Sequence, residues 1–230
     1  MTDPIAVVGT GTGVGKTVIT AGLTRLLREA GHDARAIKPA QTGHPPDDDA
    51  AFVATACADP SAATCPQYLE PALAPRVAAE VAAEDIEYES IRTACEREIA
   101  AATVPIVEGI GGLRVPLAGD HEVIDLVDDL AATAVVVTRS GLGTLNHTAL
   151  SIDALEARGI DVFGVICNEY AGETVAERTN PAELERMTGH PVETVPLLAD
   201  EASAGPRDLA IGIGDALSAA FRDRLPVKDV

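Results

Sequence analysis

The residues best able to do chemistry lie near the start of the chain, in the segment Gly9–Thr17, which reads Gly-Thr-Gly-Thr-Gly-Val-Gly-Lys-Thr. It follows the apolar run Ile5–Val8, so a buried strand leads into a glycine-rich turn and then a helix. In such a turn the backbone N–H groups point inward at a polyphosphate, and the helix start adds its positive dipole end. Lys16 can reach the terminal phosphates, and the Thr17 hydroxyl can hold Mg²⁺. Because a plain flexible turn would explain neither residue, the segment predicts a phosphate-binding loop.

Chemically capable residues also follow two other predicted strands. Lys38 begins the sequence Lys-Pro-Ala-Gln-Thr-Gly after an apolar run, and the chain has only two other lysines. A lysine stem that lies along the strand end is one interpretation. The scarcity of lysine favours the other, a cation for phosphate oxygens or for a substrate carboxylate or carbamate. Glu108 precedes Gly-Ile-Gly-Gly, where a carboxylate can close a Mg²⁺ site or cap a helix.

Three further positions are open to more than one interpretation. Asp49 ends the acidic run 47–49, whose carboxylates can cap a helix, and Asp49 can also face a metal. Asn168 at a strand end can donate to and accept from an adenine edge, or it can be a polar loop residue. We interpret His147 as a helix-start packing residue instead of a catalytic base. The chain has no Asn-Lys-x-Asp motif, which disfavours a GTPase.

Apolar runs of strand length alternate along the chain with stretches of helical periodicity. The predicted strands are 5–8, 34–37, 104–107, 134–138, 162–167 and 192–195. The predicted helices are 17–30, 50–58, 90–102, 145–155, a helix that begins at Pro181 with Asn180 as its cap, and a terminal helix over 209–221. Segment 57–88 contains several prolines, and we expect it to form a loop-rich excursion over the site.

This alternation predicts an α/β fold of the three-layer, phosphate-loop NTPase type, with a mostly parallel sheet and helices on both faces. Ligands of such sheets bind at the carboxyl ends of the strands. The motifs above should therefore meet at one edge of the sheet. Because no linker or repeat interrupts the pattern, we expect a single domain over residues 1–230.

The amino-acid composition indicates the cellular environment of the protein and limits the classes of partner that it can bind. The 230 residues include 36 acidic residues against 17 lysines and arginines, for a net charge of −19. Such a surface disfavours nucleic acid as a partner and indicates a salt-rich cytoplasm, where salt screens self-repulsion. There is no apolar stretch of about 18 residues and no basic-then-apolar leader, so we expect neither a membrane span nor secretion. The four cysteines lack metal-site spacing and fit reduced thiols of a cytoplasmic protein.

Five motifs taken together resemble those of the dethiobiotin synthetases, the ATP-dependent carboxylases of biotin synthesis. They are Gly-Thr-x-Thr-x-Val-Gly-Lys-Thr, Lys-Pro-x-x-Thr-Gly, Glu-Gly-x-Gly-Gly, Gly-x-x-Asn-His and the strand-end Asn168. The resemblance runs from residue 5 to about residue 200. Many ATPases share the phosphate loop, so the motifs of Lys38 and Glu108 are what narrow the family.

The resemblance implies a set of binding residues and makes ATP and Mg²⁺ the expected cofactors. Thr17, Asp49 and Glu108 would hold the metal, while Lys16 and Lys38 would act as catalytic cations. The nucleotide would be bound by Gly13, Val14, Gly15, Lys16, Thr17, Asp49, Glu108, Gly109, Gly111, Gly112, Asn168, Pro196, Leu197 and Leu198. The substrate would be bound by Thr12, Lys38, Thr42, Thr144, Leu145 and Asn146, the last three across the interface of a homodimer.

The implied reaction joins 7,8-diaminononanoate and CO₂ in a carbamate, whose oxygen attacks the γ-phosphate of ATP. The second amine then closes a five-membered urea ring and expels phosphate. Catalysis would rest on positioning and charge neutralisation, with no side-chain base named. The chain departs from the family at Gly11 and Gly13, where acidic residues are common, and at Glu169, where aspartate is common.

Two other functions are compatible with a phosphate loop. An amide ligase of the cobyrinic-acid type would carry an additional glutaminase domain, for which 230 residues leave little room. A partitioning or positioning ATPase, which works as a dimerising switch, typically has a further lysine early in the loop, where this chain has Thr10 and Gly11. The carboxylase interpretation is therefore favoured over both.

Overall fold

The computed structural model describes residues 3–198 and 204–225, and Lys228, the third lysine of the chain, lies outside them. Seven strands form the central sheet, namely β1 (Ile5–Gly9), β2 (Ala34–Ile37), β4 (Ala63–Thr64), β6 (Val104–Glu108), β9 (Thr133–Arg139), β10 (Val162–Tyr170) and β11 (Val192–Pro196). They lie in the order β11-β10-β9-β1-β6-β2-β4, and every neighbouring pair is parallel. The predicted parallel α/β sheet is confirmed.

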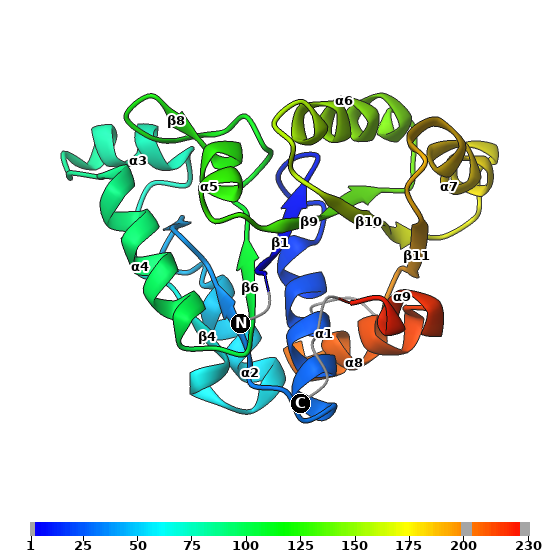
Figure 1. Ribbon diagram of the computed structural model, residues 1–230, viewed down its shortest axis with the longest axis horizontal. Helices are drawn as coiled ribbons and strands as arrows, with labels where there is room; N and C mark the ends of the chain where they lie inside the picture. Colours follow the sequence, from blue (N-terminus) through cyan, green and yellow to red (C-terminus); the bar gives the residue numbers. More distant parts are fainter. Residues whose placement is uncertain (1–2, 199–203, 226–230) are drawn as a thin grey trace.

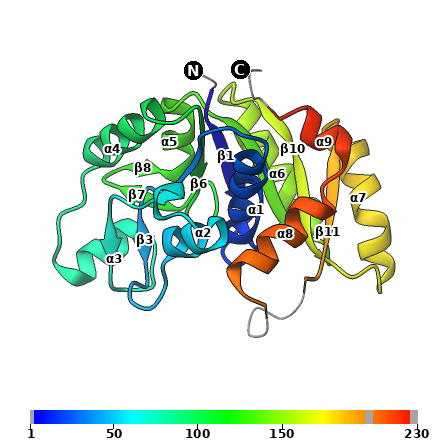
Figure 2. The same cartoon turned by 90° about the horizontal axis from the view of Figure 1, so that it is seen from below.

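Helices cover both faces of this sheet, which gives three layers (Figures 1 and 2). One face carries α1 (Lys16–Glu29), α2 (Asp49–Cys57), α8 (Pro206–Ala216) and α9 (Ala219–Asp223). The other face carries α4 (Tyr88–Ala100), α5 (Val123–Asp129), α6 (Thr144–Glu156) and α7 (Val175–Thr188). Because consecutive strand residues point to opposite faces, β1 supplies both layers: Val7 packs towards α1, and Val8 towards α6.

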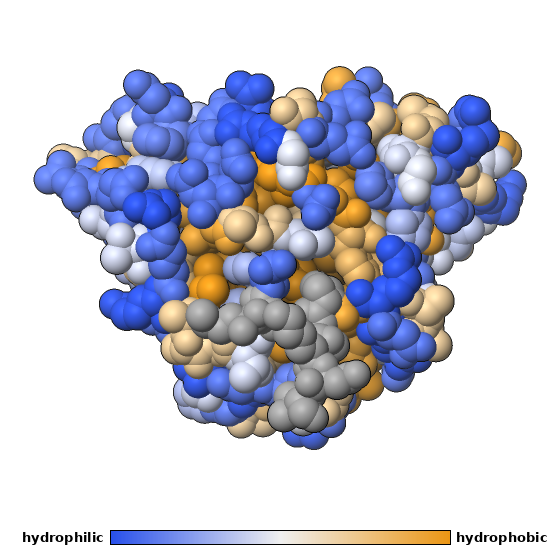
Figure 3. All heavy atoms as spheres, viewed as in Figure 1, coloured by the Kyte–Doolittle hydropathy of each residue, from blue (hydrophilic) through white to orange (hydrophobic). Residues whose placement is uncertain are grey.

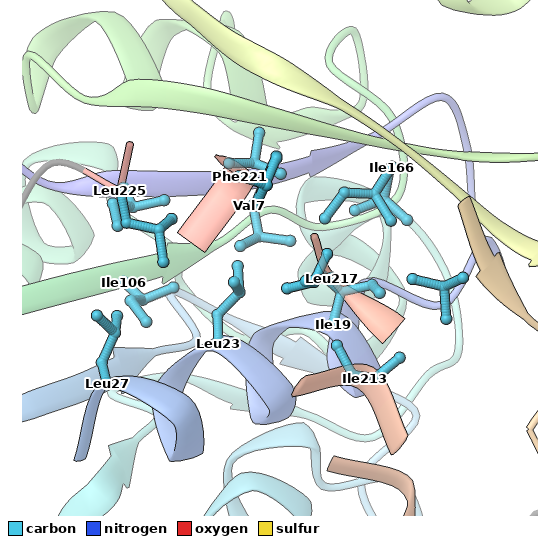
Figure 4. Close-up of a cluster of buried hydrophobic side chains, with 14 of the residues drawn as sticks. Val7, Ile19, Leu23, Leu27, Ile106, Ile166, Ile213, Leu217, Phe221 and Leu225 are labelled. Carbon is cyan, nitrogen blue, oxygen red and sulfur yellow. The ribbon is translucent and has the colours of Figure 1, made fainter. Parts of the chain in front are cut away.

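The largest core cluster lies between the sheet and α1, and Figure 4 shows it from within. Ile19, Leu23 and Leu27 recur at helical spacing on α1 and are almost completely buried there. Side chains from α8, from the link between α8 and α9, from α9 and from the segment after it belong to the same cluster, together with strand residues. They include Ile213, Leu217, Phe221 and Leu225.

Two small sheets and short helices fill the connections. They are β3 (Gln41–Thr42) paired in parallel with β5 (Tyr68–Leu69), β7 (Pro116–Ala118) paired antiparallel with β8 (His121–Glu122), a 3₁₀ turn over Pro60–Ala62, and α3 (Pro75–Ala82). The expectation of a loop-rich segment over 57–88 is therefore wrong in part. Its strand β4 extends the main sheet beside β2, and Pro75 begins a helix because proline suits a first helical position.

Three predicted boundaries also need correction. The helix expected from Pro181 begins a turn and a half earlier, because Thr174 and Glu177 form a capping box, and Pro181 lies inside it. The terminal helix expected over 209–221 is two helices, because Leu217 adopts an extended conformation and Ser218 caps the second. Strand β10 continues past Cys167, so Asn168 lies within the strand instead of after it.

The surface is mostly hydrophilic on the face seen in Figure 3, where blue side chains cover the outer helices and orange ones gather towards the middle. Among residues 3–198 and 204–225, no helix is long and apolar enough to span a membrane.

Candidate active site

The site is built at the carboxyl ends of the strands, as the sequence predicts. Strand β1 runs into the glycine-rich loop, β2 ends just before Lys38, and β6 ends with Glu108. Strand β6 lies between the other two in the sheet, so Glu108 stands between the loop and Lys38. Asp49 joins them from the first turn of α2, whose cap is Asp48. The helix-capping role expected of the acidic run thus falls to Asp48 and leaves Asp49 free to face the site.

The centre of the site is a contact between one ammonium group and two carboxylates. Lys38 Nζ lies 2.8 Å from Glu108 Oε1 and 2.5 Å from Asp49 Oδ2. Thr17 Oγ1 donates a hydrogen bond of 2.8 Å to the same Glu108 oxygen. Lys38 and Glu108 are almost fully buried, at 7% and 2% exposure. A buried charge is stable only when it is paired, and these three charges and one hydroxyl satisfy one another.

The charges of this cluster shift one another's pKa values. Burial alone would lower the pKa of Lys38, but Glu108 and Asp49 outweigh it and raise that pKa, so the ammonium stays charged. Burial raises the pKa of Glu108. Burial works in the same direction at Asp49, yet the charge of Lys38 and several hydrogen bonds lower the pKa of that carboxyl. Asp49 is therefore the more firmly ionised of the two carboxyl groups.

Lys16 is the second cation of the site. Its Nζ donates to the carbonyl oxygens of Gly11 and Gly111, at 3.0 and 2.9 Å, and so bridges the phosphate loop and the turn after β6. Burial lowers the pKa of Lys16 to about 8, and the charge of Lys38 acts in the same direction. A nearby anion would raise the pKa of Lys16 again, so bound phosphate oxygens would stabilise the charged form of this ammonium group.

The turn Gly109–Gly112 packs against the phosphate loop. The Gly109 N–H donates to the Val7 carbonyl at 2.9 Å, and a Cβ on Gly112 would lie 3.7 Å from the Gly11 Cα. Thr12 is exposed and lies beside Gly111, where a Cβ would come within 3.3 Å of its hydroxyl oxygen. These positions bring the residues predicted on the two glycine-rich turns together on one side of the sheet edge.

The far side of the loop is held by residues of β9 and β10. Asn168 Nδ2 donates to the Val14 carbonyl at 3.2 Å and lies so close to Gly15 that a Cβ there would come within 2.0 Å of it. Gly15 itself has φ +91°, which favours glycine. Asn168 keeps its carbonyl oxygen and one amide hydrogen for another partner, which is what recognition of an adenine edge requires.

The remaining predicted residues form no hydrogen bond or ion pair with Lys38 in the part of the chain that the structure describes. Thr42 is half-buried in β3, and its carbonyl accepts from Gln41 Nε2 at 2.8 Å. Pro196 and Leu197 are exposed at the end of β11, whereas Leu198 packs against the main core cluster. The three residues Thr144, Leu145 and Asn146 begin α6, and no hydrogen bond within the described part of the chain joins them to Lys38 or Glu108.

Two residues near the site have no predicted role. Gln41 Oε1 accepts from the Asp49 N–H at 3.0 Å and so fixes the start of α2. Arg139, the last residue of β9, donates to the Gly13 carbonyl from Nη2 and Nε, at 2.8 and 3.3 Å. Arg139 follows the apolar run of β9, and this position at a strand end is the sequence feature that could have identified it as a site residue.

Comparison with known proteins identifies a matching family and related sequences. A family model described as an AAA domain matches residues 3–200. Three curated relatives carry the name ATP-dependent dethiobiotin synthetase BioD. The protein of Haloferax mediterranei is 57% identical over 94% of this chain and 92% of its own length. The protein of Anaeromyxobacter sp. (strain K) is 38% identical over 90% and 94%, and that of Aquifex aeolicus 33% identical over 94% and 98%.

Solved structures agree on the fold alone. A ParA family ATPase from Chlorobium tepidum superposes with a TM-score of 0.61 at 16% identity and covers 93% of this chain and 96% of its own. The septum site-determining protein MinD from Pyrococcus horikoshii, solved with Mg-ADP, gives a TM-score of 0.55 at 14% identity, with 99% and 100% covered. At such identities the likeness extends to the phosphate-loop architecture and not to activity.

Proposed function

The chain belongs to the family of ATP-dependent dethiobiotin synthetases, and from this membership we propose that it carboxylates 7,8-diaminononanoate and closes the product to dethiobiotin at the expense of ATP. The observation that carries the proposal is the meeting of Lys38 with Asp49 and Glu108 beside the phosphate loop. A loop that only binds and hydrolyses a nucleotide needs Lys16. It has no need of a second buried lysine at the end of β2.

The nucleotide would place its phosphates in the loop Gly13–Thr17, where backbone N–H groups and the start of α1 favour an anion. Lys16 Nζ is held by two carbonyl oxygens, which a terminal phosphate can replace as hydrogen-bond acceptors. Asn168, beyond the loop, would accept from and donate to the adenine edge. Pro196 and Leu197 would line the far side of the base.

A magnesium ion fits the oxygen atoms that the site offers. Thr17, Asp49 and Glu108 contribute a hydroxyl and two carboxylates around one point, and such hard oxygen ligands suit Mg²⁺. We propose that these three residues hold the ion with the nucleotide phosphates. When bound, the ion neutralises phosphate charge. Lys38 would then exchange its bonds to the two carboxylates for bonds to phosphate and carbamate oxygens.

The chain's own residues mainly hold anions in place during the reaction. One amine of the diamine adds to CO₂ and loses a proton, which gives a carbamate. Its oxygen attacks the γ-phosphorus of ATP, and ADP leaves. The second amine attacks the carbamoyl carbon, and phosphate leaves as the ring closes. Lys16 and Lys38 would hold the carbamate and the γ-phosphate in line and offset the repulsion between them. Such positioning and charge neutralisation account for most of the catalysis of phosphoryl transfer.

The start of α6 is proposed to bind the carboxylate of the substrate across a homodimer interface. Helix α6 begins after Gly143, and no side chain caps it, so the N–H groups of Leu145 and Asn146 remain suited to an anion. Leu142, two residues before the helix, is 97% exposed, which a second subunit would cover. Thr12 and Thr42 would contact the diamine, and the cytoplasm is the proposed location.

The experiment is to incubate the purified protein with 7,8-diaminononanoate, MgATP and labelled bicarbonate, and to follow labelled dethiobiotin and phosphate together. We expect one phosphate for each labelled product. The Lys16→Ala variant serves as the control, since it should lose both products. Phosphate release that continues at the same rate without the diamine, and with no labelled product, would reject the carboxylase.

A further inference from the structure

Arg139 and Asn168 hold the outer side of the phosphate loop together. They are partners in the parallel pairing of β9 with β10. Each donates to one of two consecutive loop carbonyls, Arg139 to Gly13 and Asn168 to Val14. Asn168 is buried and neutral, whereas Arg139 brings a charge and approaches its carbonyl with two nitrogens.

Arg139 differs in its partner from most arginines of this acidic chain. Most arginines in the described ranges pair with a carboxylate, as Arg158 does with Asp125. Arg139 forms no ion pair with any residue in 3–198 or 204–225, although acidic residues outnumber basic ones twofold. The Arg139 guanidinium instead binds a backbone carbonyl of the phosphate loop. We therefore ask what this contact does for anion binding by the loop.

The geometry of the peptide bond determines how the contact between Arg139 and the Gly13 carbonyl affects the loop. In a trans peptide the C=O and the N–H point in opposite directions. The Gly13 carbonyl and the Val14 N–H belong to one peptide unit. Since the carbonyl points at Arg139, the N–H points away from it, and we infer that it faces the side on which a phosphate would bind. A charged donor on the carbonyl polarises the whole unit and makes its N–H a stronger donor.

We propose that Arg139 is a positioning residue of the phosphate cradle, which acts through the Gly13–Val14 peptide to strengthen binding of a polyphosphate. The proposal rests on the proposed function of this loop as a nucleotide site. The ligand class is a di- or triphosphate, with or without a base. Gly13 has φ +69° and no side chain that could make a contact of its own. The hydrogen bonds from Arg139 of β9 to the Gly13 carbonyl therefore help to fix the conformation of this turn.

The test measures the affinity for ADP, ATP and inorganic tripolyphosphate by calorimetry in the full-length protein. Arg139→Ala should weaken all three by about tenfold, the usual effect of one charged hydrogen bond. Arg139→Lys keeps the charge without the two-nitrogen fork and should fall between Arg139→Ala and the wild type. The control is Arg178→Ala, because Arg178 likewise donates to backbone carbonyls, those of Gly172 and Glu173, but away from the loop.

The outcomes separate the two levels of the proposal. If the wild type binds none of the three ligands, the proposed function of the loop is wrong. If the wild type binds and Arg139→Ala binds equally well, Arg139 has no part in the cradle. If ATP affinity falls but tripolyphosphate affinity does not, Arg139 acts on the base or sugar, and the inference is overturned. In steady state we expect the KM for ATP to rise and the KM for the diamine to stay unchanged, which a general loss of structure would not produce.

Discussion

The hydroxyl oxygens of Thr138 and Thr144 lie 2.7 Å apart, and this buried contact joins the end of β9 to the first residue of α6. Thr148 bonds to Thr138 at 3.1 Å from one turn further along the helix, and Thr10 reaches Thr138 at the same distance from the base of the phosphate loop. Four hydroxyls thus connect the proposed nucleotide site with the proposed carboxylate site. The Thr144 side chain is used inside the protein, so only the backbone of that residue can serve a substrate.

Thr138→Val should lower the free energy of unfolding by about 1–3 kcal/mol, because the buried hydroxyls of Thr144 and Thr148 and the half-buried hydroxyl of Thr10 lose a partner while the volume stays the same. Urea unfolding measures this loss. Thr179→Val is the control, since Thr179 is exposed on α7 and bonds only to carbonyls of its own helix. Equal effects of the two changes would show that the buried network adds nothing to stability.

Lys38→Ala should slow dethiobiotin formation by about 10²–10³ in single-turnover experiments, the usual effect of losing one charge-stabilising donor. Lys38→Gln should be little better, because it restores length without charge. Binding of ADP should survive in part, since Lys16 and the loop remain. Product formation at the wild-type rate by Lys38→Ala would remove the proposed role of this residue.

Gly15→Ala should abolish nucleotide binding, because the added Cβ would lie 2.0 Å from Asn168 Nδ2 and push that amide off the Val14 carbonyl. Gly31→Ala provides a matched control. Gly31 has φ +93°, close to the φ of +91° at Gly15, but a Cβ there meets nothing within 4 Å. Both variants should lose about 1–2 kcal/mol of stability through backbone strain. If both retain ADP binding in calorimetry, the close approach of Asn168 is unimportant.

Thiol modification should be slow at neutral pH and should accelerate with alkali. Burial raises the pKa of Cys65 to about 11 and those of Cys95 and Cys167 to about 12. A raised thiol pKa means that less thiolate, the reactive form, is present at any pH below it. At pH 8, Cys65 should react about 100-fold more slowly with iodoacetamide than an ordinary thiol, and about tenfold faster for each pH unit until pH 11. Rapid labelling of the folded protein at pH 8, at a rate close to that of the urea-unfolded chain, would contradict this.

The melting temperature should rise from dilute buffer to molar KCl. The net charge of −19 repels itself, and salt screens that repulsion. Scanning calorimetry across a KCl series tests this, with sucrose of equal osmolality as the control for solvent effects that do not involve charge. A flat or falling curve would end the interpretation of a protein suited to a salt-rich cytoplasm and leave its enzymatic function untouched.

The sequence predicts the centre of this site well because each central strand has a simple pattern. The apolar runs before Lys38 and Glu108 are short, buried and followed at once by polar or glycine residues. Such strands end where the pattern ends. Parallel strands bring their carboxyl ends to one edge, so the meeting of these residues follows from the fold class alone.

Other features could not be predicted because tertiary contacts decide them. Pro181 normally indicates a helix start, but the stronger capping box at Thr174 overrides it, and Asn180 instead donates its amide to the Ser140 and Gly141 carbonyls. The break after Leu217 depends on Glu193, whose carboxylate accepts from the Ser218 backbone and hydroxyl. No local pattern near Ser218 contains that information. The same holds for Arg139, whose partner, the Gly13 carbonyl, lies in the phosphate loop, 126 residues earlier in the chain.

The packing of α8 on α1 has a consequence for how the protein is made. The phosphate loop and α1 are synthesised long before α8, yet Ile213 of α8 packs directly against α1 and helps to close the core there. A nascent chain therefore carries an uncovered apolar face on α1 until α8 has been made, a condition that favours binding by chaperones. A truncation that removed α8 would take Ile213 away from Ile19 and Leu23, so we expect it to disturb the helix that follows the phosphate loop, far along the chain from the cut.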